Sequence, residues 1–162
     1  MEPATQDGDH RVSRRARCAE AGPSAERVSA STDAVPVGKD DDGPMPLRVV
    51  LVDDDERFRA VARRALVAEG IDVVADVECG EEVQDAVATW RPDVLLLDIG
   101  LPGIDGLEVA RQLRAKGGGP VVILMSSRDA AYGRRVAEGL AAGYLRKEEL
   151  SLTAIVELAG PS

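Results

Sequence analysis

One short run of apolar residues constrains the fold of this chain more than any other feature. Val94 to Leu97 reads Val-Leu-Leu-Leu without a break, and Asp98 follows at once. Four residues are too few for a buried helix, and they suit a β-strand that is covered on both faces. An acid at the carboxyl end of such a strand lies where open parallel sheets bind ligands, although an Asp that merely begins a turn is the simpler alternative.

Strand-like and helix-like patterns alternate on both sides of this run. Strand patterns cover residues 48–52, 71–77, 93–98, 120–125 and 143–146, and helical patterns follow them at 56–69, 81–89, 107–116, 129–140 and 149–158. The first helix is expected to bury Phe58, Val61, Ala62, Ala65 and Leu66, which recur at three- and four-residue steps. Strands that alternate with helices predict parallel βαβ units with right-handed crossovers. We therefore expect an α/β fold, a flavodoxin-like, doubly wound five-stranded parallel sheet with strand order 2-1-3-4-5.

The first 46 residues differ in composition from the rest of the chain. They contain no Phe, Trp, Tyr, Leu or Ile, so they cannot bury enough apolar area to offset the entropy of ordering. We expect residues 1–46 to be a disordered N-terminal extension and residues 47–160 to form the folded domain. The basic run from Arg11 to Arg17 is read as solvated, with a docking patch as the alternative.

Composition excludes several functional classes at this stage. The net charge of −9 does not suggest a nucleic-acid surface, so no direct nucleic acid binding is expected. Cys18 and Cys79 fit no metal or redox spacing and indicate a reducing compartment. No apolar run has the length of a membrane span, and no apolar stretch follows the N-terminal arginines as in a secretory signal. A cytoplasmic protein without membrane contact is therefore expected.

Polar residues follow four of the five expected strands. Asp53 and Asp54 follow the first, Asp98 ends the third, Ser126 follows the fourth and Lys147 follows the fifth. These ends share one edge of a parallel sheet, and the order 2-1-3-4-5 makes the first and third strands neighbours. We expect three carboxylates to meet in one crevice beside a hydroxyl and an ammonium group.

Such a group of acids needs positive charge. Two carboxylates about 5 Å apart repel by roughly 3 kcal/mol at an effective dielectric near 20. Lys147 supplies one positive charge, and an all-oxygen ligand set suits Mg²⁺ or Mn²⁺. Asp98 could then act as a nucleophile toward a phosphoryl group whose oxygens the metal and Lys147 neutralise, and Ser126 could hydrogen-bond to that group. Each residue also has a plain structural explanation, as a turn, a helix cap, a loop hydroxyl or a surface charge.

With these residues in place, the chain resembles the receiver domain of bacterial two-component response regulators. The resemblance runs from Leu47 to about Leu158 and rests on Val52-Asp53-Asp54, on Asp98-Ile99-Gly100-Leu101-Pro102-Gly103-Ile104-Asp105-Gly106, on Ser126-Ser127 and on Gly143-Tyr144-Leu145-Arg146-Lys147. It implies a stand-alone, chemotaxis-regulator-like protein. Glu148 stands where the family often has a proline after the lysine.

The resemblance also implies roles for single residues. Asp98 is the expected phospho-acceptor, with Ser126 and Lys147 as its catalytic partners. Asp54 is expected to bind Mg²⁺ directly, Asp53 mainly through water, and Gly100 through its backbone carbonyl. Ser126 and Tyr144 occupy the switch positions. The triple Asp leaves open that Asp55 replaces Asp53 in the acidic pair.

Three functions follow from this reading. The first is a phosphorelay switch, phosphorylated on Asp98 by a histidine kinase or phosphotransfer protein, which signals to an unidentified protein through the face formed by 129–140, 143–146 and 149–158. The second is a receiver-like interaction module without switching. The third is an aspartyl-phosphate phosphohydrolase, which is disfavoured because such enzymes usually need a second acid where this chain has Gly100. We therefore do not expect an enzyme.

Overall fold

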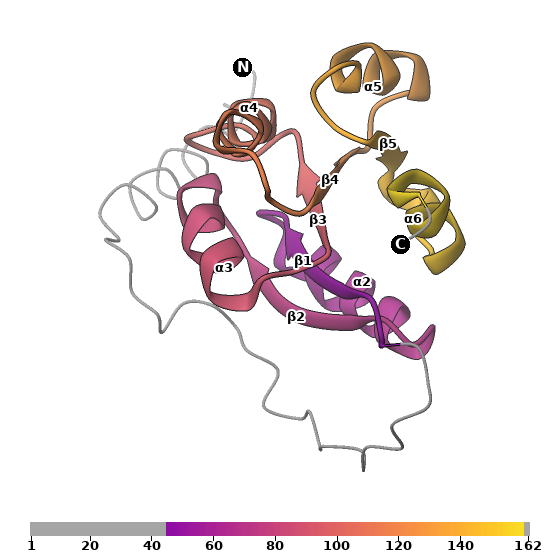
Figure 1. Ribbon diagram of the computed structural model, residues 1–162. Helices are drawn as coiled ribbons and strands as arrows, with labels where there is room; N and C mark the ends of the chain where they lie inside the picture. The colour runs from indigo at the N-terminus through magenta and orange to yellow at the C-terminus, as the bar shows by residue number, and fades with distance from the viewer. Residues whose placement is uncertain (1–44, 161–162) are drawn as a thin grey trace, which may run out of the picture.

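A computed structural model of the protein describes residues 45–160. Five parallel strands form one sheet in the order β2-β1-β3-β4-β5, which confirms the predicted fold class (Figure 1). The strands are β1 (Arg48–Val52), β2 (Asp72–Val77), β3 (Val94–Asp98), β4 (Val121–Ser126) and β5 (Gly143–Arg146). The α-helices are α2 (Glu56–Ala68), α3 (Val83–Trp90), α4 (Gly106–Lys116), α5 (Ala130–Ala137) and α6 (Leu152–Ala159), and short 3₁₀ helices cover Gly80–Glu82 and Lys147–Glu149.

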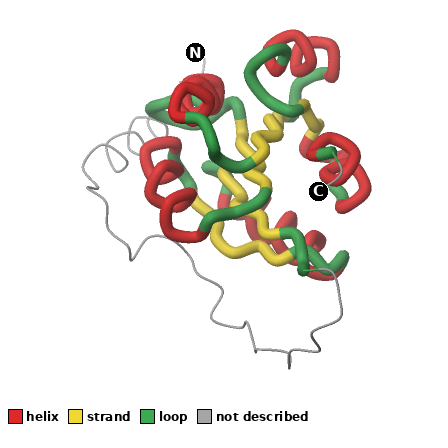
Figure 2. Tube along the Cα trace, viewed as in Figure 1, coloured by secondary structure: helices red, strands yellow, loops and turns green. Residues whose placement is uncertain are grey.

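The sheet is a central layer with helices on both faces (Figure 2). Alternate residues of each strand point to opposite faces. Val49 and Leu51 of β1 join a core cluster with Leu66 of α2 and Ile155 of α6, whereas Val50 and Val52 join the cluster that includes residues of α3, α4 and α5. The unbroken run in β3 is fully buried because it supplies side chains to both clusters.

Polar side chains cap four of the α-helices. Asp55 accepts hydrogen bonds from the backbone N–H groups of Arg57 and Phe58 at the start of α2. The caps of the other three helices each accept one backbone N–H: Asp105 for α4, Asp129 for α5 and Ser151 for α6. Each cap satisfies a donor that has no partner inside its helix, which sets where the helix begins.

The structure corrects some of the expected helix limits and faces. In α2, Ala62 and Leu66 are buried but Val61 is 68% exposed, so the apolar stripe is narrower than the sequence suggested. The helix expected over 129–140 ends at Ala137, and the one expected over 149–158 begins at Leu152, after its cap Ser151. The preceding residues Lys147–Glu149 form a separate 3₁₀ turn.

The expected N-terminal disorder and the expected absence of a membrane span remain to be placed against the described residues. The predicted disorder of residues 1–46 falls almost entirely on residues 1–44, which lie outside the described residues. Within residues 45–160, every helix is too short or too polar to cross a membrane.

Candidate functional site

The strand register brings the three predicted acids together. Val52 of β1 pairs with Leu97 of β3, so the next residues, Asp53 and Asp98, are adjacent at the carboxyl edge of the sheet. Asp53 is fully buried, Asp98 is 5% exposed and Asp54 is partly exposed. One carboxylate oxygen from each of the three acids lies within 4.8 Å of the others. This juxtaposition is the one that the sequence predicted.

Lys147 reaches the same group of acids from the end of β5. Its Nζ lies 2.5 Å from Asp53 Oδ2 and 3.4 Å from Asp98 Oδ2. The ring of Phe58, in the first turn of α2, lies 4.7 Å from the same Nζ. An ammonium group over an aromatic face is stabilised electrostatically, so Phe58 helps to hold Lys147 toward the acids.

Burial and charge shift the proton affinities of these groups in a consistent way. Burial, together with the neighbouring Asp98, raises the pKa of Asp53 to about 6, although Lys147 opposes the rise. Burial also raises the pKa of Asp98, against the effects of Lys147 and of the Gly100 N–H. Lys147 keeps its proton because the two carboxylates raise its pKa despite its partial burial. The site thus holds more negative than positive charge and favours a further cation.

The chemistry of the acids fits a hard divalent cation. Carboxylate oxygens are the ligands that Mg²⁺ and Mn²⁺ prefer. Asp53 Oδ2 is buried and accepts no well-aligned hydrogen bond, so the ammonium group of Lys147 is the charge that it faces. Asp55 points elsewhere, since its side chain caps α2. The geometry therefore favours Asp53 over Asp55 as the partner of Asp54.

The loop after β3 is held close to Asp98. The N–H of Gly100 donates to Asp98 Oδ1 at 3.2 Å, and the N–H of Ile104 donates to Glu81 Oε1 at 3.3 Å. The N–H of Gly106 donates to the carbonyl of Ile99 at 3.1 Å. A Cβ at Gly106 would lie 2.1 Å from the Asp98 carbonyl oxygen, so only glycine permits this approach of α4 to β3. Both residues of the Asp-Gly pair that ends the motif thus have a structural role. Asp105 caps α4, and Gly106 permits the close contact with β3.

The two predicted switch residues lie on adjoining strands, with Ser126 at the end of β4 and Tyr144 within β5. Ser126 is buried, and its Oγ accepts a hydrogen bond from the N–H of Arg128 at 3.1 Å. The hydroxyl of Tyr144 donates to the Arg128 carbonyl at 2.8 Å and approaches the Ser126 carbonyl at 3.4 Å. Tyr144 is 8% exposed, so its ring lies inside the domain. The structure therefore links Tyr144 to the loop that begins at Ser126.

The sequence reasoning missed two residues that contact this site. Phe58 was assigned only to the buried face of its helix, and Arg59 was not considered. Arg59 Nη1 donates to the backbone carbonyl of Asp53 at 2.7 Å. The available signal was Asp76, an acid in the middle of an apolar strand, together with arginines at 59 and 63, one helical turn apart.

Comparisons with known proteins agree on the family. The model of the response regulator receiver domain matches residues 49–158. Response regulator MprA of Mycolicibacterium vanbaalenii is 42% identical over 99 residues, which cover 61% of this chain and 42% of that protein. The receiver domain of the response regulator NarL from Mycobacterium tuberculosis superposes with a TM-score of 0.65 at 32% identity, over 72% of this chain and 98% of that one. The DNA-binding response regulator of the LuxR family from Staphylococcus aureus has a TM-score of 0.61 at 24% identity, over 69% of this chain and 94% of that one.

The fold, together with the cluster of acids at the carboxyl edge of the sheet, thus defines a receiver module of two-component regulatory systems. This chain belongs to the response regulator receiver domain family. It spans less than half the length of the MprA relative. The expectation of a stand-alone, chemotaxis-regulator-like protein therefore stays a prediction.

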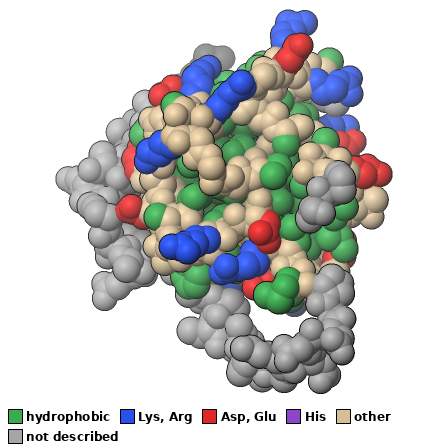
Figure 3. Space-filling model, viewed as in Figure 1, with side chains coloured by type: hydrophobic (Ala, Val, Ile, Leu, Met, Phe, Trp, Pro, Cys, Tyr) green, Lys and Arg blue, Asp and Glu red, His purple; other side chains and the backbone are tan. Residues whose placement is uncertain are grey.

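The expectation of no direct nucleic acid binding is wrong for this class of protein. One of the similar structures is that of a DNA-binding response regulator, and the matched region is only part of the MprA relative. The inference failed because a net charge is a sum over the chain. It describes neither a single face nor any other domain of a regulator. On one face, Lys and Arg side chains gather over α4 and α5 (Figure 3).

Proposed function

We propose that this domain is a phosphoacceptor switch in which Asp98 receives a phosphoryl group from a histidine kinase or a phosphotransfer protein. An oxygen of Asp98 attacks phosphorus, the bond from phosphorus to the donor's imidazole nitrogen breaks, and the electron pair stays on that nitrogen. The product is an acyl phosphate on Asp98. A switch of this kind is a signalling module rather than an enzyme, and a cytoplasmic location goes with such a donor.

The observation that carries this proposal is the position of Lys147 among three clustered carboxylates. Its ammonium group lies 3.4 Å from Asp98 Oδ2, where it can neutralise charge on an incoming phosphoryl group. Asp53, Asp54 and Asp98, with the Gly100 carbonyl, would hold Mg²⁺, which when bound would neutralise further phosphoryl charge. The Asp98 carboxylate is held by the Gly100 N–H and by Lys147, so its orientation is set before the donor arrives.

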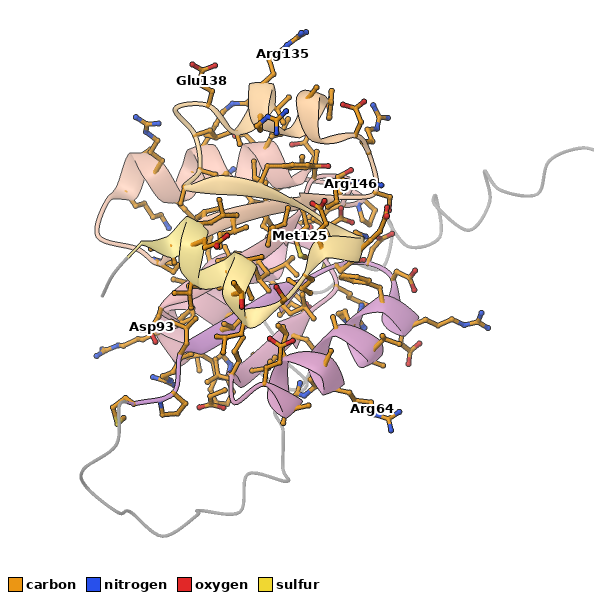
Figure 4. The ribbon with its side chains drawn as sticks, turned by 90° about the vertical axis from the view of Figure 1, so that its right-hand side faces the viewer. Arg64, Asp93, Met125, Arg135, Glu138 and Arg146 are labelled. Atoms are coloured by element: carbon orange, nitrogen blue, oxygen red, sulfur yellow. The ribbon has the colours of Figure 1, made fainter. Side chains whose placement is uncertain are left out.

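The proposed output surface is the α5–β5–α6 face. A groove of about 790 Å³ on this face is lined by residues of α5 and of the segment that follows it, by Tyr144 of β5 and by Leu158 of α6. Arg135 of α5 and Glu138, the residue after α5, are among its lining residues, and both point outward (Figure 4). The phosphoryl group carries about −1.5 to −2 charges at neutral pH, in place of the single charge of the Asp98 carboxylate. We expect that charge to draw the Ser126 hydroxyl toward Asp98, which changes the loop that holds Tyr144 and thereby the groove.

Phosphorylation of Asp98 can be tested with a small phosphoryl donor. Incubation with phosphoramidate and Mg²⁺ should add the mass of one phosphoryl group to the intact protein, and removal of Mg²⁺ with EDTA should prevent the addition. Asp98→Asn should abolish it, because the amide is not a nucleophile of the required kind. Asp105→Asn is the matched control, since Asp105 lies in the same loop but caps α4. Labelling of Asp98→Asn at the wild-type level would refute the assignment.

The alternative is a receiver-like interaction module that does not switch. The short α5, which ends at Ala137, is the observation that favours it. Calorimetric titration with Mg²⁺ separates the two proposals. Heat of binding at millimolar Mg²⁺, lost in Asp54→Asn, supports the switch, and absence of heat supports the module.

A further inference from the structure

A network of two arginines and one aspartate connects α2 to the end of β1. Arg59 Nε lies 3.3 Å from Asp76 Oδ1, and Arg63 Nη1 pairs with Asp76 Oδ2. The two arginines differ in their second acceptor. Arg59 Nη1 donates to the carbonyl of Asp53 at 2.7 Å, whereas Arg63 Nη2 donates to the carbonyl of Val73 at 3.2 Å.

The network is ordered and largely withdrawn from water. The side chains of Arg59, Arg63 and Asp76 are 14%, 19% and 12% exposed. Fixing two long arginine side chains costs about 2 kcal/mol of rotamer entropy for each, so such an arrangement needs compensating hydrogen bonds. Only the Arg59 branch ends at the acidic site. The Arg59 branch therefore connects the network to the backbone of the acidic site, whereas the Arg63 branch connects it to strand β2.

We propose that Arg59 is a positioning residue for the metal-binding acids, oriented by Asp76. This inference rests on the function proposed above. The Asp53 N–H donates to the Val77 carbonyl at 3.1 Å, and Asp53 Oδ1 accepts the Asp55 N–H at 2.8 Å. The carbonyl of Asp53 lies beyond the last strand pair of β1, and Arg59 supplies its donor. Arg59 thereby fixes the peptide plane between Asp53 and Asp54, which sets the direction of both side chains toward Asp98.

The charge balance of the network suits this role. The guanidinium group of Arg59 contacts the backbone of Asp53, so it leaves the carboxylate oxygens available to a cation. Asp76, which it shares with Arg63, offsets part of its positive charge and so reduces its repulsion of a metal ion nearby. A positively charged group that contacted the carboxylates directly, as Lys147 does, would compete with the metal instead.

The chain offers a matched pair of variants to test this role. Arg59 and Arg63 lie on the same helix and pair with the same aspartate. Arg59→Met and Arg63→Met therefore each remove one guanidinium group from Asp76. Arg59→Met should weaken calorimetric Mg²⁺ binding by about tenfold, the loss typical when a residue that orients metal ligands is removed. Arg63→Met should bind Mg²⁺ within about twofold of wild type, because its second acceptor is Val73. Arg64→Met is a surface control, since Arg64 points away from the domain (Figure 4).

A second readout needs no metal. Backbone amide hydrogen exchange at Asp54 and Asp55 in EDTA should be faster in Arg59→Met than in Arg63→Met, because the first variant frees the Asp53 peptide. Equal Mg²⁺ affinities in the two variants, or equal exchange rates, would overturn the proposal. If Arg59→Met does not fold, Arg59→Lys replaces it, since one ammonium cannot reproduce the forked contacts. Failure of the wild type itself to bind Mg²⁺ would count against the proposed function, while the exchange experiment would still decide the role of Arg59.

Discussion

Asp53 is the residue at which burial and charge conflict most strongly. Its carboxylate is fully buried, faces Asp98, and has its pKa raised to about 6. Asp54 lies in the same group of acids, and Lys147 is the cation that faces them. The ionised form of Asp53 is therefore costly in the metal-free protein. A bound metal ion would stabilise the ionised carboxylate and so remove this cost, which favours metal binding at Asp53.

This conflict predicts an unusual pH dependence of stability without metal. Asp53 has a pKa raised from 3.8 to about 6 in the folded protein, so between these values the folded state holds a proton that the unfolded state has lost. The free energy of unfolding must then fall as pH rises through this window. The loss attributable to Asp53 is at most about 3 kcal/mol, from 1.36 kcal/mol per pKa unit. Urea unfolding in EDTA at pH 4, 5, 6 and 7 measures it.

The contribution of Asp53 is isolated by comparison with Asp53→Asn. This variant should lose less stability than wild type between pH 4 and 6, because the amide does not titrate. Asp55→Asn is the control, since that side chain caps α2 and lies apart from the buried pair. If wild type and Asp53→Asn have parallel pH profiles, the elevated pKa of Asp53 is contradicted.

At the scale of elements, α5 and β5 are fitted to each other at one glycine. Gly133 lies within α5, where glycine is less favourable than alanine by about 1 kcal/mol. A Cβ at this position would lie 2.1–2.2 Å from three atoms of the Tyr144 ring. The glycine lowers the intrinsic stability of the helix but allows the ring of Tyr144 in β5 to pack against the helix backbone.

This fit predicts strong coupling between Gly133 and Tyr144. Gly133→Ala should destabilise the otherwise wild-type protein by about 1–3 kcal/mol, because the ring must move and its hydroxyl loses the Arg128 carbonyl. In a Tyr144→Ala background the same change should stabilise the protein by about 0.5–1 kcal/mol, the ordinary gain of alanine over glycine in a helix. Urea unfolding of the four proteins gives the coupling energy. Effects that add within about 0.5 kcal/mol would contradict the proposed packing.

The same elements explain what could be predicted from sequence and what could not. The strand ends at Asp53, Asp98 and Lys147 were predictable, because apolar runs locate buried strands and parallel topology places their ends on one edge. Two contacts were not predicted: the packing of Tyr144 on Gly133, and the hydrogen bond from Arg59 to the Asp53 carbonyl. Each depends on how two elements lie against each other, which periodicity within one element does not report.

At the scale of the whole molecule, the sheet separates two cores that depend on each other. Each strand of the sheet contributes at least two buried apolar residues. The central strand β3 supplies Leu95 and Leu97 to one cluster, and Val94 and Leu96 to the other. Loss of the central strands would expose both cores at once. We therefore expect one cooperative unfolding transition for the domain.

We expect that cooperative unit to span residues 47–160. Both clusters and the side chains packed against them lie between Leu47 and Ala159. A chain that begins at Met45 should therefore match the full chain in free energy of unfolding and in its urea m-value, since m scales with the surface exposed on unfolding. A chain that begins at Asp54 lacks β1, the neighbour of both β2 and β3, and should not fold. A lower m-value for the chain from Met45 would show that residues before it bury surface in the native protein and that the domain extends further toward the N-terminus.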